Sequence, residues 1–217
     1  MAVSSKDIKA LRARTGAGML DCKKALDATE GDVDKSIDWL REKGITKAAK
    51  KSGRIATEGL VHAYVHGAGK IGVLVEVNAE TDFVARNEKF INLCNDIAMH
   101  IAAAAPEYVT KDEVPEDAIA REKKVQLARI IEEGKPPHIA EKIVAGRMGK
   151  FFEERVLMEQ KFVKDDSKTI EVMLNEQIAT IGENIKIRRF SRFVLGEGLE
   201  KKVDDFAAEV AAQAGLS

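Results

Sequence analysis

The strongest constraint on the fold of this chain is a change of periodicity between residues 71 and 101. Every second residue is apolar at Ile71, Val73, Val75 and Val77, and this alternation predicts a strand with one buried face. About ten residues later, apolar residues recur at helical spacing, and Asn87 precedes them as the expected N-cap. The helical stripe consists of Phe90, Leu93, Cys94, Ile97 and Ile101. A buried strand followed by a long helix therefore forms the centre of the expected fold.

The sequence before this strand predicts its partner in a β-hairpin. Leu60, His62, Tyr64 and His66 alternate with smaller residues, and "GAGK" follows as a turn. The longer string "GAGKIG" (67–72) also matches the G-x-G-x-x-G fingerprint of dinucleotide-binding proteins, which requires a helix after the glycines to face the phosphates. A strand follows here instead. We therefore interpret these glycines as a hairpin turn and expect no direct nucleotide binding.

Three short apolar stripes predict three helices in the first 54 residues. The segments "TGAG" and "EGD" separate the helices, and Asp32 is placed to cap the third. This part holds thirteen Lys and Arg residues against eight Asp and Glu residues, whereas the whole chain has a net charge of −1. We predict a separate three-helix bundle that ends in the basic linker "KAAKKSGR" at residues 47–54. The stripes consist of Ile8 and Leu11, of Met19, Cys22 and Leu26, and of Val33, Ile37 and Leu40.

The rest of the chain predicts a mainly helical core. After a loop at 102–117, helices are expected at about residues 118–133, 137–158 and 169–181. Residues 184–195 predict a strand whose alternation slips near Arg188 and Arg189, as a β-bulge would cause. The predicted fold is α+β, with a three-helix bundle at 1–54, a core with a small antiparallel sheet of about three strands at 55–196, and a C-terminal helical module at 197–217. The last helix is marked by Leu199, Val203, Phe206 and Val210.

Composition and charge argue against several classes of protein. Charged residues make up 33 % of the chain but balance to a net charge of −1, so no overall field draws it onto nucleic acid or an anionic membrane. No apolar run approaches membrane-spanning length, and the N-terminus carries no apolar signal region. Cys22 and Cys94 lie far apart on apolar stripes, so we expect reduced core thiols rather than a disulfide or a metal pair. These features predict a cytoplasmic protein.

No arrangement of residues indicates catalysis or a metal site. His62 and His66 share one strand face, but four residues of strand separate them by roughly 13 Å, too far to share a metal ion. The sequence shows no identifiable Ser-His-Asp or Cys-His arrangement, and its carboxylates are scattered. We therefore predict no catalytic residue, no metal site and no cofactor.

The arginine-rich strand allows two interpretations. Arg188, Arg189 and Arg192 are interleaved with Phe190 and Phe193. Exposed aromatic residues among positive charges are typical of RNA-binding surfaces. Charged residues on an edge strand are equally typical of a strand protected against aggregation. The residues alone leave both interpretations open, although the second is the more common.

Asp82 and Phe83, in "VEVNAETDFVARNEKF" (75–90), stand between the strand and the long helix and belong to neither pattern. Thr81 can cap a short first turn, and Phe83 lies four residues before Asn87. The aromatic ring could fold back onto the sheet as a staple-like contact. It could instead protrude as an anchor for a partner, since partner-binding surfaces favour such residues. Spacing alone does not decide between these alternatives.

Several long segments resemble one known family. "LRARTGAGMLDCKKALDATEGDVDKSIDWLR" (11–41) closely resembles the N-terminal, UBA-like bundle of the bacterial elongation factor Ts family, and "VEVNAETDFVARNEKF" resembles the core motif of that family. The likeness continues through "IAMHIAAAAPEYV", "GKPPHIAEKIVAGRMGKFFEE", "QKFVKDDSKTI" and "GENIKIRRFSRFVLGEG". It covers essentially the whole chain, which is identified as a member of the short type of this family.

The resemblance implies guanine-nucleotide exchange on elongation factor Tu by a protein that is not an enzyme. It implies that Thr81, Asp82, Phe83 and Val84 enter the GTPase domain of the partner, where the Asp-Phe pair wedges between helices near the magnesium site. It also implies a second contact with that domain through the N-terminal bundle and a further contact beside the sheet. The residues are Arg12, Met19 and Leu20 for the second contact, and His66 and Gly67 for the further one. The last helix resembles the C-terminal contact module of the family.

One departure from the long members of the family bears on assembly. Long members carry two core repeats and an inserted helical hairpin, whereas this chain has one core of a β-hairpin and a helix. Short members supply the second core from another copy, so the resemblance implies a homodimer, with pairing through the sheet. Two rival functions remain: an RNA- or ribosome-binding module built on the basic N-terminal region and the arginine-rich strand, and a generic helical adaptor. The near-zero net charge argues against the first, since RNA binding through basic residues depends strongly on salt.

Overall fold

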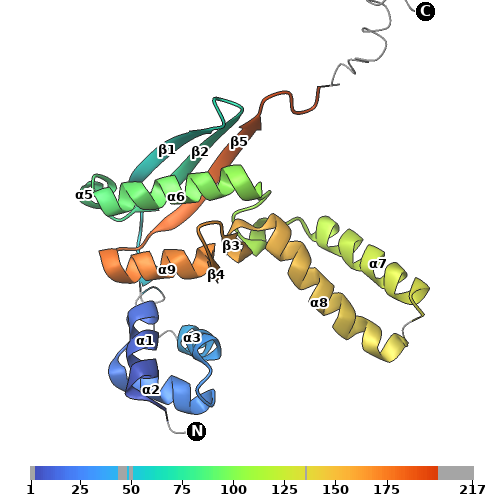
Figure 1. The fold of residues 1–217 in the computed structure, drawn as a ribbon, viewed down its shortest axis with the longest axis horizontal. Coiled ribbons are helices and arrows are strands. Elements are labelled where there is room, and N and C mark those ends of the chain that lie inside the picture. The colour runs from blue at the N-terminus through green and yellow to red at the C-terminus, as the bar shows by residue number, and fades with distance from the viewer. Residues whose placement is uncertain (1–2, 44–47, 49–50, 135, 200–217) are drawn as a thin grey trace, which may run out of the picture.

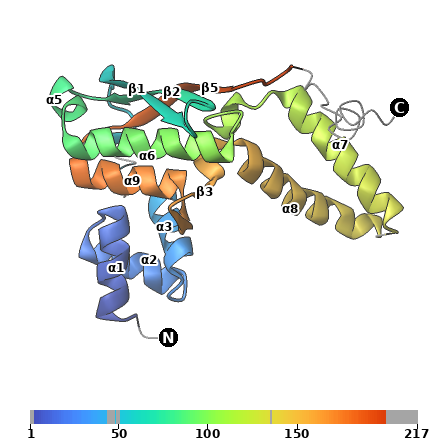
Figure 2. The same cartoon turned by 45° about the horizontal axis from the view of Figure 1, so that its top comes forward.

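The fold is a stack of a sheet and helices, and it is seen in a computed structural model that describes residues 3–43, 48, 51–134 and 136–199. Figures 1 and 2 show the sheet of β1, β2 and β5 on one side, then the long helix α6, then α9, and then the N-terminal helices. The predicted α+β fold, with three N-terminal helices ahead of a mainly helical core, is confirmed. Residues 200–217 lie outside the described residues, and with them the predicted last helix and most of the C-terminal module.

The N-terminal helices are α1 (Ser5–Thr15), α2 (Met19–Ala28) and α3 (Val33–Glu42). The predicted cap of α3 is confirmed, because the Asp32 carboxylate accepts hydrogen bonds from the amides of Asp34 and Lys35. α1 ends at Gly16, whose φ of 64° is the left-handed conformation that glycine adopts without strain. The three helices enclose a hydrophobic cluster of their own, formed by Leu11, Ala17, Cys22, Ala25, Leu26 and Leu40.

The antiparallel sheet consists of β1 (Glu58–His66), β2 (Ile71–Ala79) and β5 (Lys186–Val194), in the order β1-β2-β5. The turn 67–70 joins the first two strands, as the hairpin prediction required. The predicted bulge is also present, since Glu76 pairs with Arg189 and Val77 with Ile187, which leaves Arg188 as the extra residue. The sheet therefore keeps one continuous inner face, while Arg188 and Arg189 both lie opposite Glu76.

The main core lies between the inner face of the sheet, α6 (Glu88–Ala104) and α9 (Ile170–Ile181). The predicted N-cap of α6 is confirmed, because the Asn87 side chain accepts from the amide of Lys89 at 2.9 Å. Both cysteines are free and buried, as predicted, and they lie in different clusters. Burial raises the pKa of the Cys94 thiol to about 12. The centre of the cluster is formed by Val73, Val75, Val77, Phe90, Ile97, Ile101, Ile170 and Leu174.

A helical hairpin of α7 (Glu116–Glu132) and α8 (Pro137–Arg155) projects from one end of this core (Figure 1). The loop before it contains the 3-10 turn η1 (Lys111–Glu113). α8 ends three residues earlier than the sequence predicts, because the chain beyond it pairs with that loop. Val156 bridges to Tyr108, and the amide of Met158 donates to the carbonyl of Val109. These contacts hold the base of the hairpin, and η2 (Leu157–Glu159) follows.

A second, two-stranded sheet was not predicted. β3 (Lys161–Phe162) pairs with β4 (Asp165–Thr169) in a short antiparallel hairpin between η2 and α9. The segment "KFVKDDSKT" is too short and too charged to show an alternating pattern. Thr169 then caps α9 by accepting a hydrogen bond from the amide of Val172. The hairpin thus leads the chain from the base of α8 into the main core.

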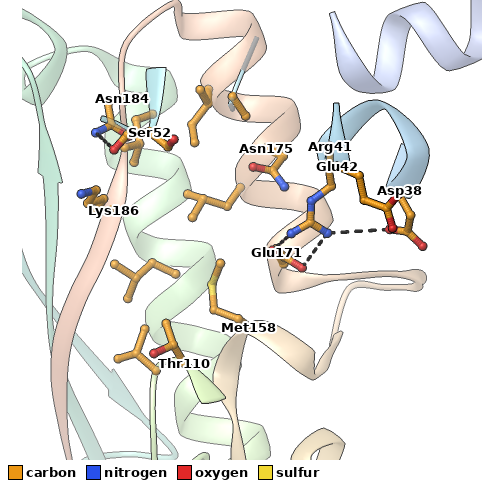
Figure 3. Close-up of a pocket in the computed structure, with 16 residues that line it drawn as sticks. Asp38, Arg41, Glu42, Ser52, Thr110, Met158, Glu171, Asn175, Asn184 and Lys186 are labelled. Atoms are coloured by element: carbon orange, nitrogen blue, oxygen red, sulfur yellow. Dashed lines mark hydrogen bonds and ion pairs between the residues drawn. The ribbon is translucent and has the colours of Figure 1, made fainter. Parts of the chain in front are cut away.

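The N-terminal bundle is joined to the core along α9. The guanidinium of Arg41 on α3 forms an ion pair with Glu171 at the start of α9, as Figure 3 shows. Between α3, α9 and β5 lies a cavity of about 790 Å³, whose apolar wall includes Met158, Leu174 and Ile185. None of the helices that the structure describes combines the length and apolar composition needed to cross a lipid bilayer.

A buried polar link ties α6 to the β3–β4 hairpin. His100 is fully buried on α6, and the backbone amide of Val163 donates to its Nδ1 at 3.3 Å. Its Nε2 therefore carries the proton and donates to Oε1 of Gln160 at 3.0 Å. Burial lowers the pKa of His100 below 6.5, although the bond to Gln160 opposes this shift. Protonation would also place a new N–H against the amide of Val163.

We predict that His100 makes the protein less stable as the pH falls below 6.5. Above that pH the imidazole is neutral in both folded and unfolded chains, whereas below it the unfolded chain binds a proton that the folded one resists. The free energy of unfolding should fall by at most about 1.4 kcal/mol per pH unit from this group. Urea unfolding of wild type and His100→Gln between about pH 7 and pH 5 measures the difference. Equal slopes in the two proteins would contradict the assignment.

Candidate partner-binding site

The candidate site is centred on α5 (Asp82–Ala85), a helix of four residues between β2 and α6. Thr81 is its N-cap, since its side chain accepts from the amide of Val84 at 3.4 Å. Phe83 is 80 % exposed, so it does not fold back onto the sheet. Val84 and Ala85 pack against the main core instead. The short helix therefore has an inner side that anchors it and an outer side that presents one aromatic ring.

Asp82 stands beside Phe83 on this outer side. It forms an ion pair with Arg86, four residues further along, with an Nη2–Oδ2 distance of 3.0 Å. The Arg86 side chain is largely exposed and that of Asp82 is about half exposed, so this pair contributes little to stability and leaves the carboxylate free to exchange partners. The structure thus places Asp82 and Phe83 together at the surface, while it directs Val84 inward.

A carboxylate that sequence reasoning missed holds the start of α5. Glu183 follows α9 in the chain, and one of its oxygens, Oε2, accepts from the amides of Glu80 and Thr81 at 3.1 and 3.0 Å. The other oxygen accepts from the Thr81 hydroxyl at 2.7 Å. About a hundred residues separate the two segments, so no local periodicity could have indicated this contact.

The N-terminal site residues lie on the surface of the bundle beside α9. Leu20 is 74 % exposed and Met19 is 49 % exposed at the start of α2, and Arg12 is exposed on α1. Arg12 and Met19 line a groove of about 510 Å³ whose other wall includes Ala179 and Thr180 of α9. Because α9 ends at Ile181, two residues before Glu183, this groove and α5 lie toward the same end of α9. The structure therefore brings these two sets of site residues to one end of the molecule.

His66 and Gly67 lie apart from the other site residues. They are exposed at the turn between β1 and β2, at the end of the sheet opposite to α5 (Figure 1). Eight residues of β2 separate this turn from Ala79, which corresponds to roughly 26 Å. The ring Nδ1 of His66 is hydrogen-bonded to the Tyr64 hydroxyl at 2.9 Å. A partner that touched both ends would have to extend along the sheet.

The arginine-rich strand is an edge strand of the sheet whose guanidinium groups have partners within the molecule. Arg188 and Arg189 both bind the Glu76 carboxylate, at 2.8 and 2.7 Å, and these bonds lower the pKa of Glu76 to about 2. Arg192 donates from Nε and Nη2 to the carbonyl of Ala102 in the last turn of α6. These contacts favour the interpretation as a protected edge strand over an RNA-binding surface.

The described residues hold no group of three or more His, Cys, Asp or Glu side chains placed to bind a metal ion. His62 pairs with Asn95, at 3.4 Å between Nε2 and Oδ1, on the helix that covers the sheet. The "GAGKIG" string is a hairpin turn followed by β2, so it lacks the helix that a dinucleotide site requires. The chemistry of the candidate site is therefore that of protein recognition through an exposed aromatic ring.

Comparison with known proteins gives one consistent result. The family model described as "Elongation factor TS" matches residues 24–197. The chain is 58 % identical over 216 residues to "Elongation factor Ts" of Geobacter sulfurreducens, covering 100 % of both chains. It is 58 % identical over 211 residues to the protein of the same name from Desulforamulus reducens, covering 97 % of each. The protein of that name from Citrifermentans bemidjiense is 59 % identical over 215 residues, with 99 % of this chain and 100 % of that one covered.

We predict that Phe83→Ala leaves the stability of the protein almost unchanged. Its ring is 80 % exposed, so truncation should alter the free energy of unfolding by no more than about 0.5 kcal/mol. Phe90→Ala is the matched control, because Phe90 is fully buried seven residues further on and its truncation should cost about 3–5 kcal/mol. Chemical denaturation of both variants measures the two values. A large loss of stability in Phe83→Ala would show that this ring is buried in the core and would contradict its exposed position.

Proposed function

The chain belongs to the elongation factor Ts family, and we propose that it is the guanine-nucleotide exchange factor of elongation factor Tu. It binds Tu carrying GDP, promotes release of the nucleotide and leaves Tu ready for GTP. The observation that carries the proposal is the exposed Phe83 at the position that corresponds to the wedge in the family motif. Such a factor is not an enzyme, and as a translation factor it acts in the cytoplasm.

The mechanism follows from the coupling between two binding equilibria. Backbone donors and a magnesium ion hold the phosphates of GDP in a GTPase. Consider a protein that binds nucleotide-free Tu more tightly than it binds Tu carrying GDP. That protein weakens the binding of GDP to Tu. By thermodynamic linkage, GDP weakens the binding of that protein to Tu by the same free energy. Asp82 and Phe83 supply this preference by entering Tu near the magnesium site. No catalytic group is needed, and GTP reverses the process by binding to the opened site.

The other surfaces hold Tu while α5 acts. We assign Arg12, Met19 and Leu20 to a second contact with the GTPase domain, as the family resemblance implies. The groove that Arg12 and Met19 line lies toward the same end of α9 as α5, which supports this assignment. His66 and Gly67, roughly 26 Å away along the sheet, would meet a different part of Tu. The chain thus divides into a bundle at 1–54 that binds, a core at 55–196 that carries α5, and a C-terminal module at 197–217.

We predict that the protein accelerates release of fluorescent GDP from elongation factor Tu in a stopped-flow experiment, and that Phe83→Ala reduces this acceleration by at least about tenfold. Loss of a central aromatic anchor commonly costs 2 kcal/mol or more of interaction. Asp82→Ala should have a milder effect, because water can replace part of its polar contacts.

Val163→Ala is the matched control for this experiment, since Val163 is also exposed but lies near the β3–β4 hairpin. It should exchange nucleotide like wild type. Wild type that leaves the GDP-release rate unchanged would refute the proposed function. Phe83→Ala that releases GDP as fast as wild type would refute only the assignment of the wedge.

The outer face of the sheet supports the proposal of a homodimer. Val61, Val65, Leu74 and Phe193 share this face and are between 47 % and 67 % exposed. Near its centre, Arg188 and Arg189 share the single carboxylate of Glu76, so this cluster carries one net positive charge within an otherwise apolar face. An apolar surface of this kind pairs well with its own copy about a two-fold axis, which is the commonest symmetry of soluble oligomers. A second copy would supply the second core that long members of the family carry in one chain.

We predict a dimer of twice 23.8 kDa at micromolar concentration, and a monomer for Leu74→Glu. Leu74 lies on the outer face of the central strand. A glutamate at this position stays in water in the monomer and is buried only if the outer faces of two copies meet, which would destabilise the dimer. Val163→Glu, a charge introduced on the surface away from this sheet, should remain dimeric. Sedimentation velocity measures all three proteins, and circular dichroism verifies that they are folded. Wild type at 23.8 kDa alone would count against the dimer.

A further inference from the structure

The turn after α9 is bonded to the segment that precedes Phe83 from both sides. Glu183 accepts from the amides of Glu80 and Thr81 and from the Thr81 hydroxyl. In return, the amide of Asn184 donates to Oε1 of Glu80 at 2.6 Å. Glu80 and Thr81 are thus bonded to Glu183 and Asn184 through two carboxylates and three backbone amides. We call this arrangement the Glu80–Glu183 clasp.

The clasp fixes the direction of the Thr81 hydroxyl. A threonine hydroxyl has one proton and two lone pairs. Because the proton is donated to Oε1 of Glu183 at 2.7 Å, a lone pair is left to accept the amide of Val84 at 3.4 Å. Without Glu183 the hydroxyl could rotate, and the N-cap of α5 would be made only part of the time. Glu183 therefore acts on α5 through Thr81.

The linker from the N-terminal bundle closes the clasp on its far side. Nδ2 of Asn184 donates to the carbonyl of Arg54 at 2.7 Å and to that of Ser52 at 3.4 Å, and Figure 3 shows Asn184 pointing at Ser52. The guanidinium of Arg54 lies 3.5 Å from Oε2 of Glu80, and Lys51 donates to the carbonyl of Gly182. The amide of Asn184 and the charge of Arg54 both lower the pKa of the Glu80 carboxyl, so it is ionised at neutral pH. Asn184 itself is buried.

The helix that carries Phe83 needs such support. α5 has four residues, far fewer than a helix requires to be stable alone in water. Val84 and Ala85 anchor its inner side to the core. Its N-terminal end is held by Thr81, and Thr81 is held by Glu183. The orientation of Asp82 and Phe83 therefore depends on a residue from another part of the chain.

We propose that Glu183 is a positioning residue for nucleotide exchange, which keeps α5 in the orientation that lets Phe83 enter elongation factor Tu. This role rests on the proposed exchange function. A mobile α5 would have to become ordered each time Tu opens, and the free energy of that ordering would be lost from stabilisation of the open state. First binding of Tu through the N-terminal bundle would be unaffected. Loss of Glu183 should thus lower the maximal rate of GDP release. It should change much less the concentration of this protein at which the rate is half-maximal.

Glu183→Gln tests the role, because glutamine has the same shape but replaces one accepting oxygen with an NH₂ group. We expect the maximal rate of GDP release to fall about tenfold, as loss of a charge-assisted hydrogen bond would cause, with little change in the half-saturating concentration. Hydrogen exchange read by NMR should show faster exchange of the Glu80 and Thr81 amides in the isolated variant. The melting temperature should fall only slightly, because the partly buried bonds of Glu183 hold one short segment and leave the main core unchanged.

A double-mutant cycle separates positioning from a general loss of structure. If Glu183 acts only through α5, Glu183→Gln should slow GDP release in wild type but add little in Phe83→Ala, where the group it positions is already gone. Glu107→Gln is the matched control, since Glu107 is a surface carboxylate paired with Arg155 at the base of the α7–α8 hairpin. This variant should release GDP at the wild-type rate and leave the Glu80 and Thr81 amides protected.

The outcomes distinguish this proposal from the function on which it rests. Slow exchange in Phe83→Ala together with normal exchange in Glu183→Gln would overturn the positioning role and leave the exchange function intact. Equal, additive losses in the two backgrounds would also overturn it, because Glu183 would then act independently of Phe83. Wild type that fails to accelerate GDP release would reject the exchange function and the positioning role together.

Discussion

Packing of α6 across the inner face of the three-stranded sheet is the contact on which the rest of the molecule depends. Val75 and Val77 of β2 and Phe90 and Ile97 of α6 are fully buried in this contact. Strand and helix follow each other in the chain, so the link between them must reverse direction beyond the end of the sheet. α5 is that link, and Phe83 points away from a core that its neighbours already fill. The exposed ring is thus a consequence of how the core is built.

The same contact divides the sheet into two faces with different tasks. Alternation turns Val73 and Val75 toward α6 and leaves Leu74 and Glu76 on the outer face, where Leu74 is 47 % exposed and Glu76 is bound by Arg188 and Arg189. The surfaces proposed for elongation factor Tu lie elsewhere, around α5, on the N-terminal bundle and at the β1–β2 turn. If the outer face pairs with a second copy as proposed, elongation factor Tu can still reach its own proposed contacts.

Sequence periodicity was sufficient for the large elements and failed where contacts are remote. The stripes of α6 and α9, the hairpin turn and the bulge at Arg188 all follow from local spacing, and each is present. The β3–β4 hairpin has too few apolar residues to show a period, and α8 ends early because Val156 pairs with a distant loop. For the site, spacing placed Phe83 at a junction but left its direction open. Glu183 was missed because its partners lie about a hundred residues earlier.

The bulge in β5 gives this strand one position where its length can change without turning the strand over. Loss of one residue from a regular strand moves every later side chain to the opposite face. In β5, Ile187 and Phe190 both face inward with two residues between them, because Arg188 is accommodated as an extra residue. Removing Arg188 would restore regular pairing and keep Phe190 and Arg192 inside and Phe193 outside. Relatives that differ in length by one residue at this point can therefore share the same sheet.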